Sequence, residues 1–350
     1  MPKRSKFSWF KYVLVLLGLF VIVGIAGPKP PKVDFTKLQQ KHYPTDLHQL
    51  EDSLNAAEAA LPLKPDNQAR IIWDTPYVKT AYSIVYLHGN GASQEEGDPI
   101  HEALAHRYGC NLFLARLDQH GLKGDDLMLH LNPAKWMQSA LDAIEVGKAI
   151  GDKVILVSCS TGSTLGLYLE SQYPGLVSSH IMFSPNIDLY DSKSFLLVQP
   201  WGLQIARLVL RGKNYTWEAP KVAEQYWYTS YRIEGLITLK AIINQTMTHE
   251  DFNKIKDPVF MAYYYRDEEN QDHEVSVRRM LEMYRQLSTP ENLKRKVALP
   301  DADTHIIASD MFNDHLGTLW TPLVSYCEEV LKLTPVDSSD YITFMDLRPK

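Results

Sequence analysis

Short apolar runs alternate with segments of helical spacing through the first half of the chain. The runs with the length and composition of buried strands are 69–73, 82–87, 111–117, 154–157 and 180–183. Helical spacing of apolar residues lies between them, most clearly from 133 to 150 and from 161 to 171. Such alternation is typical of a mostly parallel sheet with helices on both faces. We therefore predict an α/β fold.

The alternation stops between about residues 187 and 255. This stretch is helical in pattern, rich in tryptophan and tyrosine, and contains no convincing strand. Strand-like runs return at 259–264 and 296–299, and a last helix is predicted from 309 to 331. Ligands bind at the carboxyl end of a parallel sheet, which helices inserted between two of its strands can cover. The pattern favours a helical cap inserted before the strand near residue 259 over a helical excursion packed at the side.

The amino terminus has the pattern of a membrane-targeting segment. Four basic residues among the first eleven precede an almost uninterrupted apolar run from Tyr12 to Ala26. At about 1.5 Å per residue the run is short for a ~30 Å hydrocarbon core, but Trp9 and Phe10 lengthen it. We predict a transmembrane anchor with the body on the exported side, because the basic flank stays in the cytoplasm. The alternative is a signal peptide cut after Ala26, which leaves a secreted or periplasmic protein.

These patterns divide the 350-residue chain into parts. We predict a transmembrane or signal segment at 1–27, then a stalk and helical extension at 28–68, in which residues from about 33 to 69 have a polar helical pattern. An α/β domain is predicted at 69–335, with its helical cap at about 187–255, followed by a tail at 336–350.

Composition narrows the class of protein. Hydrophobic residues make up 45% and charged residues 22% of the chain, as in globular proteins. The net charge of −6 and the lack of a basic stripe in the body argue against a nucleic-acid partner. Cys110, Cys159 and Cys327 have the spacing of neither a zinc site nor a disulfide framework. The sequence contains no recognisable metal-ligand cluster or phosphate-cradling loop, so we expect no cofactor and no metal.

A strand is predicted to turn sharply into a helix at the sequence Ser-Cys-Ser-Thr-Gly, residues 158–162. Such a turn raises one side chain above the sheet and needs small residues two places before and after it. Ser158 and Gly162 meet this need around Ser160. A turn centred on Ser158 would place Leu156 at a position that must be small, and one centred on Ser163 fails in the same way. We therefore predict Ser160 as a nucleophile.

Two later loops offer a base and an acid for this serine. His305 follows the strand predicted at 296–299 and precedes the last helix, where a general base is expected in this order of elements. The loop after the strand at 259–264 holds five carboxylates, which leaves the acid ambiguous. Asp272 suits a residue held at the end of this loop, whereas Asp267 directly follows the strand. We favour Asp272 and keep Asp267 as the alternative.

The segment His-Gly-Asn-Gly that starts at His88 follows the strand at 82–87. Its glycines let the backbone approach a substrate closely. We therefore predict that the backbone N–H groups of Asn90 and Thr161 form an oxyanion hole. His88 itself is expected to hold this loop through hydrogen bonds and not to act as the base.

With these motifs in this order, the chain resembles the serine hydrolases of the α/β-hydrolase superfamily. It is most similar to the group of lidded esterases, monoacylglycerol lipases and serine-aminopeptidase-like proteins. The resemblance covers about residues 71–331 and rests on HGNGAS, SCSTG, the loop acid and the late histidine. The chain departs from the family in having Ser158 in place of the first glycine of G-x-S-x-G, and in a longer loop at 266–275.

The resemblance implies hydrolysis of a carboxylic ester through an acyl-serine intermediate, and the aromatic cap favours a hydrophobic acyl group. The expected partners are a small-molecule ester or lipid-like substrate and, through the amino-terminal segment, a membrane. Two alternatives stay open: an acyltransferase that uses the same triad, and a binding module that keeps the fold without catalysis.

Overall fold

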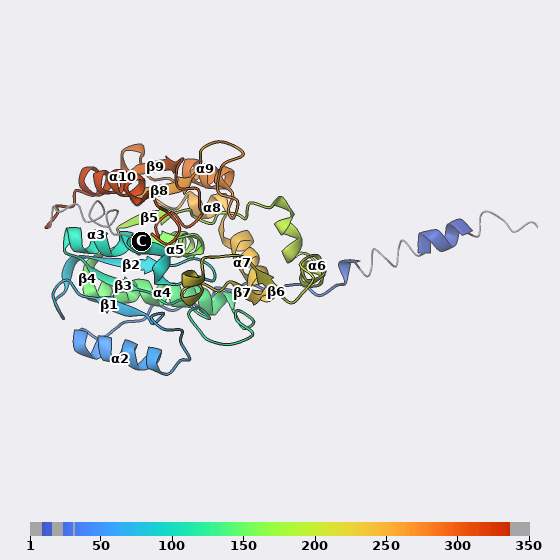
Figure 1. Cartoon of the computed structure of the whole chain (residues 1–350), viewed down its shortest axis with the longest axis horizontal. Helices are drawn as coiled ribbons and strands as arrows, with labels where there is room; N and C mark the ends of the chain where they lie inside the picture. The colour runs from blue at the N-terminus through green and yellow to red at the C-terminus, as the bar shows by residue number, and fades with distance from the viewer. Residues whose placement is uncertain (1–8, 16–23, 31, 337–350) are drawn as a thin grey trace, which may run out of the picture.

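The computed structural model describes residues 9–15, 24–30 and 32–336, and this described part contains a seven-stranded sheet (Figure 1). The strands are β1 (Arg70–Ile72), β2 (Thr80–Leu87), β3 (Asn111–Leu114), β4 (Gly151–Cys159), β5 (Ser179–Phe183), β8 (Val259–Tyr264) and β9 (Lys294–Leu299). They lie in the order β1-β3-β2-β4-β5-β8-β9, and each neighbouring pair is parallel except β1 with β3. The predicted α/β fold with a mostly parallel sheet is confirmed.

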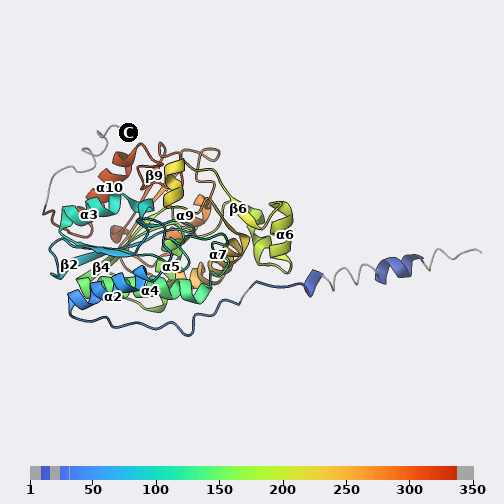
Figure 2. The same ribbon diagram turned by 60° about the horizontal axis from the view of Figure 1, so that its bottom comes forward.

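Helices cover both faces of this sheet (Figure 2). The α-helices are α2 (Leu47–Ala59), α3 (Ile100–Tyr108), α4 (Pro133–Ile150), α5 (Thr161–Gln172), α6 (Gly202–Val209), α7 (Ile233–Thr246), α8 (His249–Phe252), α9 (Val277–Gln286) and α10 (Leu316–Glu329). Short 3₁₀ helices are η1 (Gln94–Gly97), η2 (Ser192–Val198), η3 (Lys221–Gln225) and η4 (Glu291–Leu293).

The central strand β2 contributes side chains to the hydrophobic core on each face of the sheet. Successive side chains of a strand point to opposite faces. Ile84 and Tyr86 accordingly belong to the core that includes α3 and α10, whereas Val85 and Leu87 belong to the core that includes α4, α5 and α9. A strand buried on both faces reads as a continuous apolar run, which is why it was visible in the sequence.

Helix α4 has the predicted bounds because both ends are marked in the sequence. The Asn132 side chain accepts hydrogen bonds from the backbone N–H groups of Ala134 and Lys135, and Pro133 occupies the first turn. At the other end Gly151 closes the helix and begins β4.

The amino-terminal extension is less helical than predicted. Within residues 33–69 the helix is confined to α2, which begins after Asp46, whose carboxylate accepts from the N–H groups of His48 and Gln49. Residues 32–46 have no regular helix, and Phe35, one of their apolar side chains, packs against the core of the domain. The polar pattern there reflects exposure on one side, not helical periodicity.

The segment between β5 and β8 is also not purely helical, contrary to the prediction. It contains a two-stranded antiparallel sheet of β6 (Asn214–Thr216) and β7 (Ser230–Arg232), in which Tyr215 lies opposite Tyr231. Strands of three residues offer too few alternations to be recognised. Because β5 and β8 are neighbours in the main sheet, this segment leaves and returns at adjacent strands.

The predicted membrane anchor lies partly outside the described residues, since 16–23 are not among them. Within residues 9–15, 24–30 and 32–336, no helix has both the length and the apolar character needed to cross a bilayer. Residues 9–15 and 24–25 are helical. Of the predicted tail at 336–350, only Val336 is described.

Gly162 sits where the first turn of α5 passes the end of β2. A Cβ atom at this position would lie 2.1 Å from the backbone oxygen of Leu87 and 3.0 Å from that of His88. Neither backbone atom can move without disturbing the sheet, so the close approach requires glycine.

We predict that Gly162→Ala destabilises the fold by about 3 kcal/mol or more, because overpacking against backbone cannot be relieved by a rotamer change. Gly212→Ala is the matched control: the nearest atoms to a Cβ there lie 3.9 Å away, so a change within about 0.5 kcal/mol is expected. Urea unfolding of both variants measures the difference. Equal stability of the two would show that α5 is not held this closely to β2.

Candidate active site

Ser160 stands at the turn between β4 and α5 with φ of 49° and ψ of −117°. This is a strained conformation for a residue other than glycine, and it persists because the surroundings hold it. The Ser160 N–H donates to the carbonyl of Phe183 at 3.0 Å. The Ser160 carbonyl accepts from the N–H groups of Ser163 at 3.1 Å and Asn186 at 3.0 Å. Ser160 is 6% exposed and lines a large cavity.

The neighbouring serine and cysteine face other surroundings. Ser158 is fully buried, and its hydroxyl lies 2.9 Å from that of Ser163. Cys159 belongs to the apolar core on the α3 side, where burial, together with the nearby Glu96, raises the pKa of its thiol well above the usual value. Neither residue lines the cavity that Ser160 borders.

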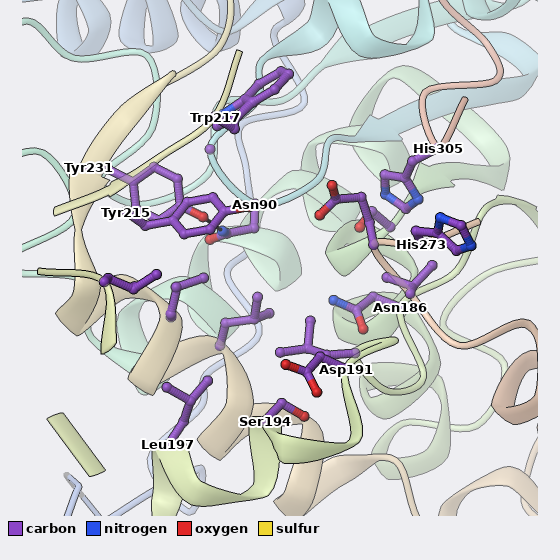
Figure 3. Close-up of a pocket in the computed structure, with 18 of the residues that line it drawn as sticks. Asn90, Asn186, Asp191, Ser194, Leu197, Tyr215, Trp217, Tyr231, His273 and His305 are labelled. Carbon is purple, nitrogen blue, oxygen red and sulfur yellow. Dashed lines mark hydrogen bonds between the residues drawn. The ribbon is translucent and has the colours of Figure 1, made fainter. Parts of the chain in front are cut away.

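His305 lines the same cavity (Figure 3) and pairs with Asp272, whose side chain is fully buried. His305 Nδ1 lies 2.6 Å from Asp272 Oδ2. The other oxygen, Asp272 Oδ1, accepts from the backbone N–H groups of Glu274 at 2.9 Å and Val275 at 3.1 Å. Burial by itself would lower the pKa of His305, but the charge and hydrogen bond of Asp272 outweigh it and raise this pKa to about 9. The imidazole ring is thus held in one orientation, with Nδ1 toward the carboxylate.

The alternative acid, Asp267, is placed elsewhere. It is exposed, and its Oδ1 accepts from the backbone N–H groups of Glu269 at 2.9 Å and Asn270 at 2.8 Å. These bonds hold the pKa of Asp267 below its usual range, chiefly through Asn270. Asp267 organises the turn of the long loop, and the structure brings Asp272, not Asp267, to His305.

The loop that begins at His88 lies beside Ser160, and its Asn90 lines the cavity. Thr161 is fully buried as the first residue of α5. His88 Nε2 accepts from the N–H of Leu117 at 3.1 Å, so its Nδ1 carries the proton and donates to the carbonyl of Gly89 at 2.9 Å. Burial lowers the pKa of His88 to about 4. His88 therefore stays neutral and holds the loop, as expected.

Sequence reasoning missed Glu96, a carboxylate that lines the cavity although it is 3% exposed. Glu96 Oε2 accepts from the N–H of Gly89 at 2.5 Å and from the hydroxyl of Tyr86 at 3.4 Å. Burial raises the pKa of Glu96, while the bond from Gly89 opposes this shift. A glutamate in a polar loop carries no signal of burial in the sequence. In the fold it joins the end of β2 to the loop beside Ser160.

The cavity measures about 760 Å³ and is lined by both polar and apolar side chains. Its polar lining includes Ser160, His305 and His273, and also Asn90, whose Nδ2 donates to the hydroxyl of Tyr231 at 3.1 Å. The apolar wall comes from the segment between β5 and β8 and includes Ile205, Val209, Tyr215, Trp217, Tyr231, Leu236 and Leu239. Figure 3 shows Tyr215, Trp217 and Tyr231 across the cavity from His305. The segment between β5 and β8 therefore supplies much of the cavity lining, and its role as a cap stays a prediction.

One group of side chains has the composition of a metal site. Potential ligand atoms of Asp98, His101 and Glu102 lie within 4.8 Å of one another around the start of α3. His101 Nε2 lies 2.9 Å from the carbonyl of Gln94, to which it can donate. None of these three residues is among those that line the cavity beside Ser160.

The sequence matches neither a protein-family model nor a curated protein. The structure is similar to a metagenome-derived lipolytic enzyme from the study of LipS and LipT, with a TM-score of 0.61 and 14% identity over 76% of this chain and 99% of that one. It is also similar to the monoacylglycerol lipase of Paleococcus ferrophilus, at 0.52 and 13% over 74% and 98% of the two chains. Est1E of Butyrivibrio proteoclasticus, solved with ferulic acid, has a TM-score of 0.51 and 13% identity over 76% and 95%. The fold of this chain is that of the α/β-hydrolases.

The His305–Asp272 pair predicts a pH-dependent stability. Because folding raises the pKa of His305 from about 6.5 to about 9, the pair stabilises the fold fully below pH 6.5. This contribution is lost as the pH rises through 9. Asp272→Asn should therefore reduce the free energy of unfolding by up to about 3 kcal/mol more at pH 6 than at pH 10.

Urea unfolding of Asp272→Asn and of Asp267→Asn at both pH values tests this expectation. The exposed Asp267 does not contact His305, so its variant should show little difference between pH 6 and pH 10. A deficit of Asp272→Asn that is the same at both pH values would contradict the assignment of a charged pair.

Proposed function

We propose that this protein is a serine hydrolase that cleaves carboxylic esters with a hydrophobic acyl group. One observation carries the proposal. Ser160, at its strained turn, and His305, which pairs with Asp272, line the same cavity, and the lining across from His305 is apolar. The similarity in fold to lipolytic enzymes and a monoacylglycerol lipase also supports it.

The reaction follows from these positions. His305 in its neutral form takes the proton from the Ser160 hydroxyl as the serine oxygen attacks the ester carbonyl, and Asp272 stabilises the imidazolium that forms. Because the pKa of His305 is raised to about 9, the share of this neutral form, and with it the rate, should increase as the pH rises toward 9. The backbone N–H groups of Asn90 and Thr161 stabilise the oxyanion. His305 then gives its proton to the departing alcohol, which leaves an acyl-serine. Water, activated by the same histidine, releases the acid and restores Ser160.

Glu96 and Gly89 have a supporting part in this scheme. A Cβ atom on Gly89 would lie 2.7 Å from Glu96 Oε1 and 3.0 Å from the Cβ of Ser160, so the three residues are closely packed. By accepting the N–H of Gly89, Glu96 orients the next residue, Asn90, toward the reacting oxygen.

We also propose that residues 12–26 anchor the protein in a membrane with its catalytic domain on the exported side. The apolar run and its basic flank support this proposal. Sequencing of the mature amino terminus tests it, and a chain that starts at Gly27 would show that the segment is removed as a signal peptide.

Ser160→Ala should abolish ester hydrolysis, with a loss in kcat on the order of 10³-fold or more, and leave the fold intact. The reason is that no other hydroxyl replaces the nucleophile at the turn. Turnover of a short-chain ester and labelling by a fluorophosphonate measure the effect, with Ser163→Ala as the control that keeps both. Turnover at the wild-type rate by Ser160→Ala would refute the assignment. Product analysis with an added alcohol distinguishes hydrolysis from acyl transfer.

Asp272→Asn should slow turnover by about 10²–10⁴-fold, because the amide no longer holds the imidazole in its productive tautomer. Asp267→Asn, in the same loop but exposed, should change kcat by less than about twofold. Steady-state kinetics of the two variants side by side decide between the acids. A larger loss in Asp267→Asn would show that Asp272 is only structural.

A further inference from the structure

Large apolar side chains gather on the outer part of the cap. In α6, Leu208 is 79% exposed and Val209 is 71% exposed. Phe195 in η2, against which α6 packs, and Trp201 and Ile205 at the start of α6 are exposed as well. These five residues are termed the cap patch. Large apolar side chains that are exposed together on neighbouring turns of the chain are typical of a surface that contacts a membrane or another protein.

The amino-terminal segment reaches the cap at this patch. The N–H of Trp201 donates to the carbonyl of Pro28 at 2.9 Å. Gly27 lies against the Trp201 indole, since a Cβ atom there would fall 2.1 Å from the ring nitrogen. Pro28 and Lys29 also line a hollow with Gly202 of α6. In Figures 1 and 2 alike, residues 24–30 lie beside α6.

The same helix borders the catalytic cavity. Ile205, Val209 and Leu210 line the cavity and are also 37%, 71% and 42% exposed. A ligand that enters the cavity past these side chains therefore comes from the medium, water or lipid, that contacts the cap patch.

We propose that the cap patch rests on the lipid bilayer that holds residues 12–26, and that the ester passes along α6 from the membrane into the cavity. This inference rests on the proposed function and on the proposed anchor. A bilayer is favoured over a second protein because the patch continues into a segment whose own side chains, including Trp9 and Ile25, are apolar and exposed. Around the patch, Lys29, Lys193 and Arg211 are exposed and suit anionic headgroups.

A fluorescent probe tests the contact directly. The full chain, with an environment-sensitive dye on Leu208→Cys, is placed in vesicles of phosphatidylcholine and phosphatidylglycerol that contain brominated lipid. The three native cysteines are buried and should not compete for the dye. Asp152→Cys is the control, because it is exposed at the start of β4, at the opposite end of the strand from Ser160.

The probe at position 208 should shift to shorter wavelength and be quenched by the brominated lipid, and the probe at 152 should do neither. Absence of quenching at 208 overturns the proposal. A shift at 208 that needs no lipid and grows with protein concentration also overturns it, since that result indicates contact with a second copy.

Kinetics test the route of the substrate. Leu208→Asp alters the patch at a residue that does not line the cavity, and Val222→Asp makes the same change at an exposed apolar residue of η3. Leu208→Asp should hydrolyse a long-chain ester in vesicles about tenfold more slowly than the wild type, because an interfacial contact is lost, and keep its rate on a short water-soluble ester. Val222→Asp should match the wild type on both.

The outcomes separate this inference from the function on which it rests. Equal rates of Leu208→Asp and wild type on the ester in vesicles overturn the membrane route. Failure of the wild type to hydrolyse either ester contradicts the proposed function instead, and the fluorescence comparison then decides on the bilayer contact alone.

Discussion

The close approach of α5 to the end of β2 is the steric constraint on which the site depends. Gly162 removes the side chain that would collide with the carbonyl of Leu87, and this lets the chain turn at Ser160 within a single residue. The strained conformation of Ser160 is held by backbone hydrogen bonds to Phe183, the last residue of the neighbouring strand β5, and to Asn186 beyond that strand. The position of Ser160 is thus determined by the sheet and not by the side chains that line the cavity.

The first residues of the cap are hydrogen-bonded to the loop that carries Asp272. Lys240 of α7 is buried and pairs with Asp188, whose carbonyl accepts the N–H of Ser276. Leu189, the residue after Asp188, and Val275, the residue before Ser276, form an antiparallel β-bridge. The first residues of the cap and the acid loop therefore form one hydrogen-bonded unit. A shift of the cap at this point would also shift Asp272 and, through it, the ring of His305.

The sequence predicts those parts of the fold that depend on residues close together in the chain, such as helix caps and tight turns. The bounds of α4 follow from its capping asparagine, proline and glycine, and Ser160 follows from the size limits around its turn. The choice between Asp272 and Asp267 could be favoured but not decided, because both lie in a loop whose path depends on contacts with β8 and the cap. Glu96 was missed for a related reason. Its burial is produced by the packing of η1 over Gly89, and nothing in the local pattern distinguishes it from the exposed glutamates of other loops.

The apolar wall of the cavity is built from one continuous segment that leaves the sheet at β5 and rejoins it at the adjacent strand β8. Because the two ends of this insertion lie on adjacent strands, a change in its length need not alter the hydrogen-bonding register between β5 and β8. The proposed nucleophile, acid and base lie outside this segment, on the turn at Ser160 and in the two later loops. The cap can therefore be lengthened, shortened or replaced as a single unit, which changes the shape of the cavity while the proposed nucleophile, base and acid stay in place.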